Sequence, residues 1–223
     1  TALAVEEALA APAGQAPSAA AESLRRASVA ARRRHAELRE LRGRPGDGAQ
    51  VFPACSELVL RLGDPSPLAE GEAQRIGEVV ATFREAADRH GVRYVKLLSD
   101  QVVAVEGFDR SPDEAAAIMA EIALLLQDAC ARTISRGRAG FALGLDGGAV
   151  VGSAVGFAEA PYNVWGEPVR IATRLATTAE SRSILVSESV HDRLRAQYLF
   201  RRRGAFYLER VGELTTYVLR GRL

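Results

Sequence analysis

Lys96 and Asp100 form the first pair of residues whose types and spacing suit a chemical role, with a carboxylate suited to a metal ion and a lysine on the same face. They lie four residues apart around a short turn, Ser99-Asp100, which joins two apolar runs typical of strands. Because residues four apart on a strand point to the same face, we expect both side chains to project together. A carboxylate held at a rigid turn is a suitable ligand for Mg²⁺. Two alternatives remain open: Asp100 is equally typical of an ordinary turn, and Lys96 of an exposed strand face.

Arg170 and Arg174 form the second pair. They lie four residues apart in a predicted helix that has Pro168 in its first turn. Like charges at this spacing on one helix face destabilise the helix by about 0.2–0.5 kcal/mol, and the positive end of the helix dipole adds to the repulsion. An anion bound between them relieves this repulsion, so we predict a phosphate or carboxylate site here. The alternative is that Glu167 pairs with Arg170 at the surface.

The composition indicates a globular domain and gives no reason to expect a nucleic-acid or membrane partner. Hydrophobic residues make up 48% of the 223 residues and charged residues 26%, with a formal net charge of +1. No apolar run approaches the roughly 20 residues needed to span a bilayer. Cys55 and Cys130 each lie in an apolar stretch and are predicted to be reduced core residues, which is typical of cytoplasmic proteins. The leading Thr1 suggests a piece of a longer protein.

Residues 1–48 differ from the rest of the chain and are rich in Ala, Arg and Pro. Residues 11–18 contain two prolines and a glycine, which predicts a linker, and residues 19–41 are mostly strong helix formers. A weak heptad seam within this helix suggests a possible coiled coil; its members are Leu24, Ala31 and Leu38. The cluster Arg32-Arg33-Arg34 is compatible with contacts to nucleic acid or anionic lipid. We favour a solvated connecting helix that pairs in a dimer.

Residues 49–223 alternate between strand and helix patterns, which predicts an α+β domain. Strands are predicted at 51–60, 92–98, 101–107, 141–145, 149–155, 184–187, 206–208 and 215–219. Helices are predicted at 67–90, 111–136, 166–178 and 188–196. The sequence Asp146-Gly147-Gly148 predicts a hairpin turn between two of these strands. The order β-α-β-β-α-β at the front of the domain indicates a ferredoxin-like core.

Three segments of this domain resemble the class III adenylyl and guanylyl cyclases. They are the strand–turn–strand Tyr94–Val105, the strand-to-helix segment Tyr162–Leu175 with its Trp165-Gly166, and the closing segment Arg203–Leu219. The resemblance implies a cyclase homology domain over 49–223, with the ferredoxin-like core of that fold and an N-terminal helical extension. In the family, two such domains pair head to tail around each active site. A ribose 3′-hydroxyl attacks the α-phosphorus, pyrophosphate leaves, and two divalent cations, Mg²⁺ or Mn²⁺, are held by two aspartates.

The resemblance assigns expected roles to five residues of this sequence. Asp100 matches the second metal-binding aspartate and Lys96 the base-reading lysine. Asn163 stands where adenine-specific members carry Asp, and an amide offers both donor and acceptor to a base. Arg170 replaces the asparagine that orients the ribose, whereas Arg174 matches the arginine that supports charge in the transition state.

Other expected residues of the family are missing. The segment 51–57 contains no aspartate, so Glu57 supplies a carboxylate for the first metal only if the alignment shifts. The phosphate-binding Gly-Phe-Thr loop is absent, and the lysines of the closing hairpin fall at Glu209 and Val211. We therefore predict a degenerate cyclase homology domain that is catalytically weak or inactive, and that acts in dimerisation, nucleotide sensing or signal transmission.

Two other functions remain to be weighed. The first is an active cyclase, with Glu57 and Asp100 as metal ligands, working as a homodimer or as one half of a heterodimer. The second is a nucleic-acid module, which is disfavoured because base-stacking aromatics are scarce on the central strands.

Overall fold

The computed structural model describes residues 48–63, 72–98, 100–134, 140–154, 162–208 and 211–223. By its internal contacts the chain divides between Pro45 and Gly46. The predicted helix, heptad seam and arginine cluster of residues 1–47 lie outside the described residues.

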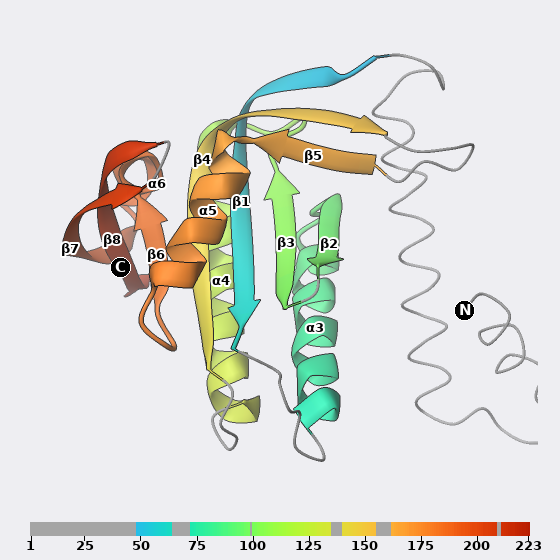
Figure 1. Cartoon of the computed structure of the whole chain (residues 1–223), viewed down its shortest axis with the longest axis vertical. Coiled ribbons are helices and arrows are strands. Elements are labelled where there is room, and N and C mark those ends of the chain that lie inside the picture. Colours follow the sequence, from blue (N-terminus) through green and yellow to red (C-terminus); the bar gives the residue numbers. More distant parts are fainter. Residues whose placement is uncertain (1–47, 64–71, 99, 135–139, 155–161, 209–210) are drawn as a thin grey trace, which may run out of the picture. The chain divides into compact units, whose positions relative to one another are not determined.

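The described residues form an α+β domain whose eight strands make one sheet (Figure 1). The first elements along the chain are β1 (Gln50–Leu62), α3 (Glu72–Arg89), β2 (Tyr94–Leu98), β3 (Gln101–Glu106), α4 (Pro112–Thr133) and β4 (Phe141–Ala154). The elements that follow are β5 (Tyr162–Gly166), α5 (Glu167–Thr178), β6 (Ile184–Ser187), α6 (Glu188–Leu194), β7 (Tyr198–Leu208) and β8 (Gly212–Arg222). The strand order is β2-β3-β1-β4-β6-β8-β7, and β5 pairs with β4. The order β2-β3-β1-β4 with its two crossover helices confirms the predicted ferredoxin-like core.

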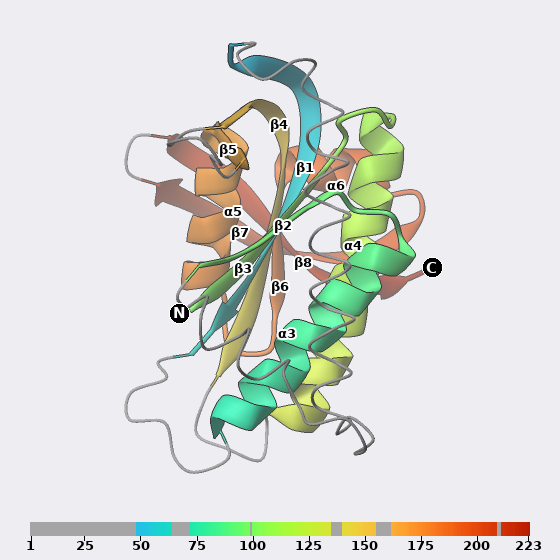
Figure 2. The ribbon, with the colours of Figure 1, turned by 90° about the vertical axis from the view of Figure 1, so that its right-hand side faces the viewer.

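Helices cover both faces of the sheet. Helices α3 and α4 lie on one face, and α5 lies on the other, against β4 and β1 (Figures 1 and 2). On the α3/α4 face, Leu58 and Leu60 of β1 are fully buried in one cluster with Phe83 of α3 and Met119 of α4. Burying a side chain of this size stabilises a fold by about 1.5–3 kcal/mol. Because side chains alternate along a strand, the β1 residues on either side of these leucines point to the opposite face, which α5 covers.

The predicted hairpin at Asp146-Gly147-Gly148 is wrong. Strand β4 runs unbroken through these residues and pairs with β1 on both sides of them. Two glycines of β4 allow α5 to pack closely on the strand. A Cβ at Gly144 would lie 2.0 Å from the Ala172 carbonyl oxygen, and a Cβ at Gly148 would lie 2.9 Å from Cγ of Pro168. Glycine in a strand often marks such a close approach rather than a turn.

Residues 162–166 form strand β5, which opens the predicted strand-to-helix segment Tyr162–Leu175 and pairs antiparallel with the end of β4. The closing strands β7 and β8 are 11 residues each, longer than predicted, because they pair with one another over nearly their whole length.

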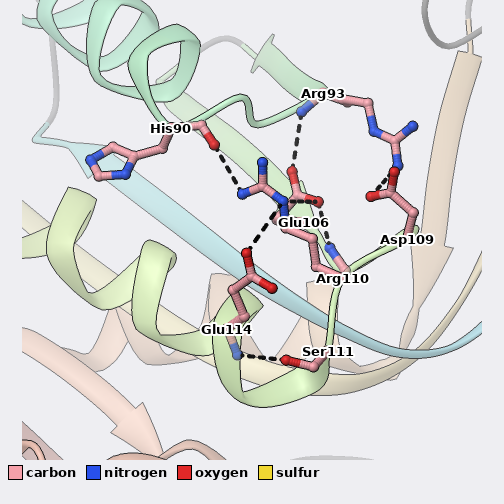
Figure 3. A network of polar contacts seen from close by, with 8 residues as sticks. His90, Arg93, Glu106, Asp109, Arg110, Ser111 and Glu114 are labelled. Carbon is pink, nitrogen blue, oxygen red and sulfur yellow. Dashed lines mark hydrogen bonds and ion pairs between the residues drawn. The ribbon is translucent and has the colours of Figure 1, made fainter.

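A charged network around the buried Glu106 lies at the connection between β3 and α4 (Figure 3). Glu106 ends β3, is fully buried, and accepts a hydrogen bond from the backbone N–H of Arg93 at 3.4 Å. Arg110 lies 4.0 Å from the Glu106 carboxylate, donates to the His90 carbonyl at 2.9 Å, and approaches Glu114 at 3.9 Å. Burial raises the pKa of the Glu106 carboxyl, and these donors oppose that rise. The network joins the end of α3 to the start of α4 and so holds both crossover helices against the sheet.

Two sequence expectations about composition can be compared with the structure. Cys55 and Cys130 are both buried and unpaired, as predicted. Within the described ranges, no helix is long and apolar enough to cross a membrane.

Candidate functional site

Lys96 and Asn163 lie next to one another, although they are 67 residues apart in the sequence. Lys96 projects from β2 and donates a hydrogen bond from Nζ to Oδ1 of Asn163 on β5. The same two strands bring Tyr94 and Tyr162 into an edge-to-face contact, with ring centroids 6.4 Å apart. The Lys96 ammonium has three N–H donors, and this bond uses one of them. The structure therefore brings together the two residues that were predicted to bind a base.

Lys96 has a further property that the sequence analysis missed. It is the only lysine in the chain, which otherwise uses arginine for all its strongly basic residues. A lysine provides a compact point charge on a flexible stem, whereas arginine provides a planar fork. A residue count would have singled out this position without any structure.

Asp100 lies at the β2–β3 turn and faces Arg61 rather than a second carboxylate. Arg61 Nε is 3.6 Å from Asp100 Oδ2, and each side chain is about a third exposed. The backbone N–H of the next residue, Leu62, donates to the Asp100 carbonyl oxygen at 2.8 Å. An exposed ion pair of this kind contributes little to stability, about 0–1 kcal/mol. Its importance lies in the positive charge that it places beside Asp100.

Glu57 is not brought near Asp100. It lies four residues before Arg61 on β1, opposite Val105 of β3, whereas Arg61 lies opposite Gln101 at the turn. Four residues of strand correspond to roughly 13 Å. The Glu57 side chain is fully buried, and neither carboxyl oxygen has a hydrogen-bond partner among the described residues. The structure therefore separates the two residues that were predicted to share metal ions.

The neighbour of Glu57 is Asp146 of β4, which lies directly opposite it in the ladder. Burial raises the pKa of Glu57 well above its ordinary value, and the charge of Asp146 raises it further. Asp146 is also buried, but its Oδ1 accepts hydrogen bonds from Ser187 and, at 3.1 Å, from Ser189. Burial raises the pKa of Asp146 too, whereas these hydroxyl groups lower it. The sequence analysis missed this carboxyl pair because it had assigned Asp146 to a turn.

Arg170 and Arg174 lie exposed on α5, as their spacing predicted. The helix begins at Glu167, directly after β5, so both arginines follow closely on Asn163. Neither forms an ion pair within 4.0 Å with another described residue, and the alternative pairing of Arg170 with Glu167 does not occur. Two guanidinium groups are thus displayed on the helix that follows the Lys96–Asn163 pair, which is an arrangement suited to an anion.

The described residues do not fit a two-metal centre. No group of three or more His, Cys, Asp or Glu side chains able to hold a metal ion occurs among them. Asp100 already has a cationic neighbour, Glu57 is buried elsewhere, and the segment 64–71, which follows β1, is not described. By their chemistry, the available groups can hold an anion and a base, whereas the facing carboxyl groups of Glu57 and Asp146 are buried in the sheet.

The sequence is similar to those of adenylate and guanylate cyclases. The model of the family described as the adenylate and guanylate cyclase catalytic domain matches residues 69–221. An adenylate cyclase of Mycobacterium bovis is 30% identical over 149 residues, which cover 66% of this chain and 34% of that protein. A membrane guanylyl cyclase of Dictyostelium discoideum is 26% identical over 168 residues, which cover 74% of this chain and 11% of that protein. The chain therefore spans about a third of the length of the mycobacterial relative.

Solved structures show the same fold. The guanylate cyclase domain of RhGC from Catenaria anguillulae, solved in complex with GTP, matches with a TM-score of 0.70 at 17% identity, covering 78% of this chain and all of that one. The adenylyl cyclase CyaB from P. aeruginosa matches with a TM-score of 0.69 at 15% identity, covering 78% of this chain and 96% of that one. At these identities the likeness concerns the fold alone.

Proposed function

The chain belongs to the adenylate and guanylate cyclase catalytic domain family, and we propose that it is a degenerate member, catalytically weak or inactive. Its role in this proposal is to bind a nucleotide and to pair with another cyclase homology domain, so that it senses a nucleotide or transmits a signal. The family as a whole generally uses divalent metal ions, whereas the described residues of this chain do not form a centre for them.

The observation that carries this proposal is the Arg61–Asp100 ion pair. Cyclisation needs the 3′-hydroxyl to be activated and the charge on the phosphates to be offset, which two metals on paired carboxylates accomplish. Here a guanidinium faces Asp100, the residue that matches one carboxylate of that pair. Removing one preorganised group from a transition state typically costs about 10²–10³ in rate, so this substitution together with the missing phosphate loop supports very low activity.

Nucleotide binding is supported by the groups that remain. Lys96 and Asn163 lie together, and Arg170 and Arg174 are exposed and form no ion pair with another described residue. Charge-assisted hydrogen bonds from guanidinium groups to phosphate are among the stronger contacts available to a protein. A nucleoside triphosphate is the ligand that uses both sets of groups.

Pairing with a second domain is supported by exposed apolar side chains around the same strands. Leu97 and Leu98 end β2 and Trp165 lies on β5, and each is more than 40% exposed. Exposed aromatic side chains such as that of Trp165 are enriched in protein interfaces. The proposed partner is a second copy of this chain or another cyclase homology domain.

The alternative is an active nucleotidyl cyclase that converts ATP or another nucleoside triphosphate to a cyclic nucleotide and pyrophosphate. The presence of Lys96, Asp100 and Arg174 at the expected positions favours it. In its heterodimer form, the partner supplies the missing groups, so activity appears only when an active cyclase domain is added.

Equilibrium binding and sedimentation test the proposal directly. Fluorescent ATP and GTP analogues are titrated into the wild type, Lys96→Ala and the matched surface variant Arg195→Ala, and mass is measured by analytical ultracentrifugation with and without nucleotide. The proposal predicts saturable binding that is weakened at least about tenfold by Lys96→Ala, the usual loss for a charged hydrogen bond, and is unchanged by Arg195→Ala. Absence of saturable binding in the wild type would remove nucleotide sensing from the account.

A further inference from the structure

The contact between the end of β1 and the β2–β3 turn is set by the backbone. The β1–β3 ladder reaches its last pair at Arg61 and Gln101, and Leu62 N–H then bonds to the Asp100 carbonyl at 2.8 Å. These bonds fix how far β1 extends past the turn. The register of the β1–β3 ladder therefore places Arg61 next to Asp100.

The side chain of Arg61 follows this placement. Its Nε lies 3.6 Å from Asp100 Oδ2, and no other ion pair of either residue occurs among the described residues. Arginine keeps its charge at all ordinary pH values. The guanidinium of Arg61, which belongs to the neighbouring strand β1, therefore places a permanent positive charge beside the Asp100 carboxylate.

This arrangement conflicts with the binding of a divalent cation at Asp100. A cation that coordinates this carboxylate must displace the guanidinium or lie against a like charge, and it finds no second carboxylate on β1 at this level. Mg²⁺ and Mn²⁺ prefer oxygen ligands and bind poorly to a single neutralised carboxylate. A guanidinium, in contrast, can itself bind phosphate oxygens.

We infer that Arg61 takes the place of a divalent cation beside Asp100, so that this chain binds a nucleoside triphosphate without a metal ion. The inference rests on the proposed nucleotide binding for its second half. Its first half, that Asp100 does not hold a divalent cation, stands independently. Asp64, the next carboxylate after β1 in the sequence, lies outside the described residues and is included in the test.

The first arm of the test measures Mn²⁺ binding by electron paramagnetic resonance and by calorimetry, without nucleotide. The wild type is compared with Arg61→Asp, Arg61→Gln and the double variant Arg61→Asp with Asp100→Asn. We expect no saturable Mn²⁺ site in the wild type. Arg61→Asp should gain a saturable site, because it has two carboxylates, and the double variant should lose that site again. Arg61→Gln, which removes the charge without adding a ligand, should remain without a saturable site.

Two results in this arm would overturn the inference. One is a wild-type Mn²⁺ site that disappears with Asp100→Asn or Asp64→Asn. The other is a folded Arg61→Asp protein, judged by circular dichroism, that gains no site. If Arg61→Asp does not fold, Arg61→Glu, which also adds a second carboxylate, serves as the second variant, and it should gain a Mn²⁺ site in the same way.

The second arm measures nucleotide affinity in EDTA and in excess Mg²⁺. We expect the two affinities to agree within about twofold for the wild type, and Arg61→Gln to weaken binding in EDTA by about tenfold, as expected for a lost charged contact to phosphate. A wild-type affinity that falls tenfold or more in EDTA overturns the inference. Absence of any nucleotide binding refutes the proposed function instead, while the Mn²⁺ arm still decides the role of Arg61.

Discussion

Glu57 and Asp146 lie directly opposite one another in the β1–β4 ladder, so two carboxyl groups share one buried position on the sheet. Asp146 is held by the hydroxyl groups of Ser187 and Ser189, whereas the oxygens of Glu57 have no partner. Two neighbouring carboxylates in a buried place cannot both ionise cheaply, so one of them keeps its proton. The lack of partners assigns that proton to Glu57.

This pair gives the protein a predictable pH dependence. Folding raises the pKa of Glu57 above its ordinary 4.5, so the native state holds the proton more tightly than the unfolded state. The contribution of Glu57 to the unfolding free energy is therefore greatest near and below pH 4.5, and it falls as the pH rises toward the pKa of Glu57 in the folded state. Glu57→Gln should reduce the loss of unfolding free energy between pH 5 and pH 8, as measured by urea denaturation. Glu85→Gln, at an exposed site on α3, is the control, and an equal loss in all three proteins would contradict the assignment.

Replacement of Glu57 by an apolar residue should stabilise the fold outright. Glu57→Leu removes a fully buried polar group that has no hydrogen-bond partner, a group that typically costs about 1–3 kcal/mol. We expect a gain of that order in unfolding free energy at pH 8 and a smaller gain at pH 5. A loss at pH 8 would indicate that the Glu57 carboxyl has a stabilising partner.

Chemical modification provides a test of the Lys96–Asn163 contact. Because Lys96 is the only lysine, an amine-reactive reagent modifies a single side chain, and the α-amino group of the chain provides an internal reference. We expect Asn163→Ala to speed modification of Lys96, because the amine loses its acceptor, and bound nucleotide to slow it severalfold. The rates come from peptide mass spectrometry. Equal rates with and without nucleotide would place the bound base elsewhere.

The arginines of α5 should contribute to affinity but not to stability. Arg170→Ala and Arg174→Ala are each expected to weaken triphosphate binding by about tenfold, the usual loss for a charged hydrogen bond. Each should leave unfolding free energy unchanged or raise it by about 0.2–0.5 kcal/mol, because the repulsion between them is relieved. Unchanged affinity in both variants would show that phosphate does not reach this helix.

The glycines of β4 test the packing of α5. Gly144→Ala places a Cβ 2.0 Å from the Ala172 carbonyl oxygen and should destabilise the fold by about 1–3 kcal/mol, as overpacking does. Gly77→Ala is the matched control, because Gly77 lies at an exposed position of α3 and no described atom lies within 4 Å of its Cβ. That change should stabilise the fold by up to about 1 kcal/mol. The measurement is thermal or urea unfolding, and equal effects would contradict the close approach.

The sequence predicted the ferredoxin-like core well because its signals are local. Apolar periodicity marked α3, and the sequence predicted a second helix from residue 111, where the Ser111 hydroxyl caps α4. The misread hairpin at Asp146-Gly147-Gly148 has a different origin. A glycine required by a turn and a glycine required by a helix packed on the strand are identical in a sequence, and only the position of α5 distinguishes them.

The candidate site was predicted in part for the same reason. Lys96 and Asn163 were identified by motif, and the structure brings them together. Arg61 was not identified, because its meeting with Asp100 depends on the β1–β3 register, which no local pattern specifies. Glu57 was chosen as a carboxylate near the expected position, and the register moves it about four residues along the strand, to a buried place beside Asp146.

The most direct test of the account is a search for cyclic product. Wild-type protein and Asp100→Ala are incubated with Mn²⁺ or Mg²⁺ and each of ATP, GTP, CTP and UTP, and cyclic nucleotides are quantified by mass spectrometry. The account predicts that the wild type forms no more product than Asp100→Ala with any of the four. Product formed by the wild type and abolished by Asp100→Ala would contradict it.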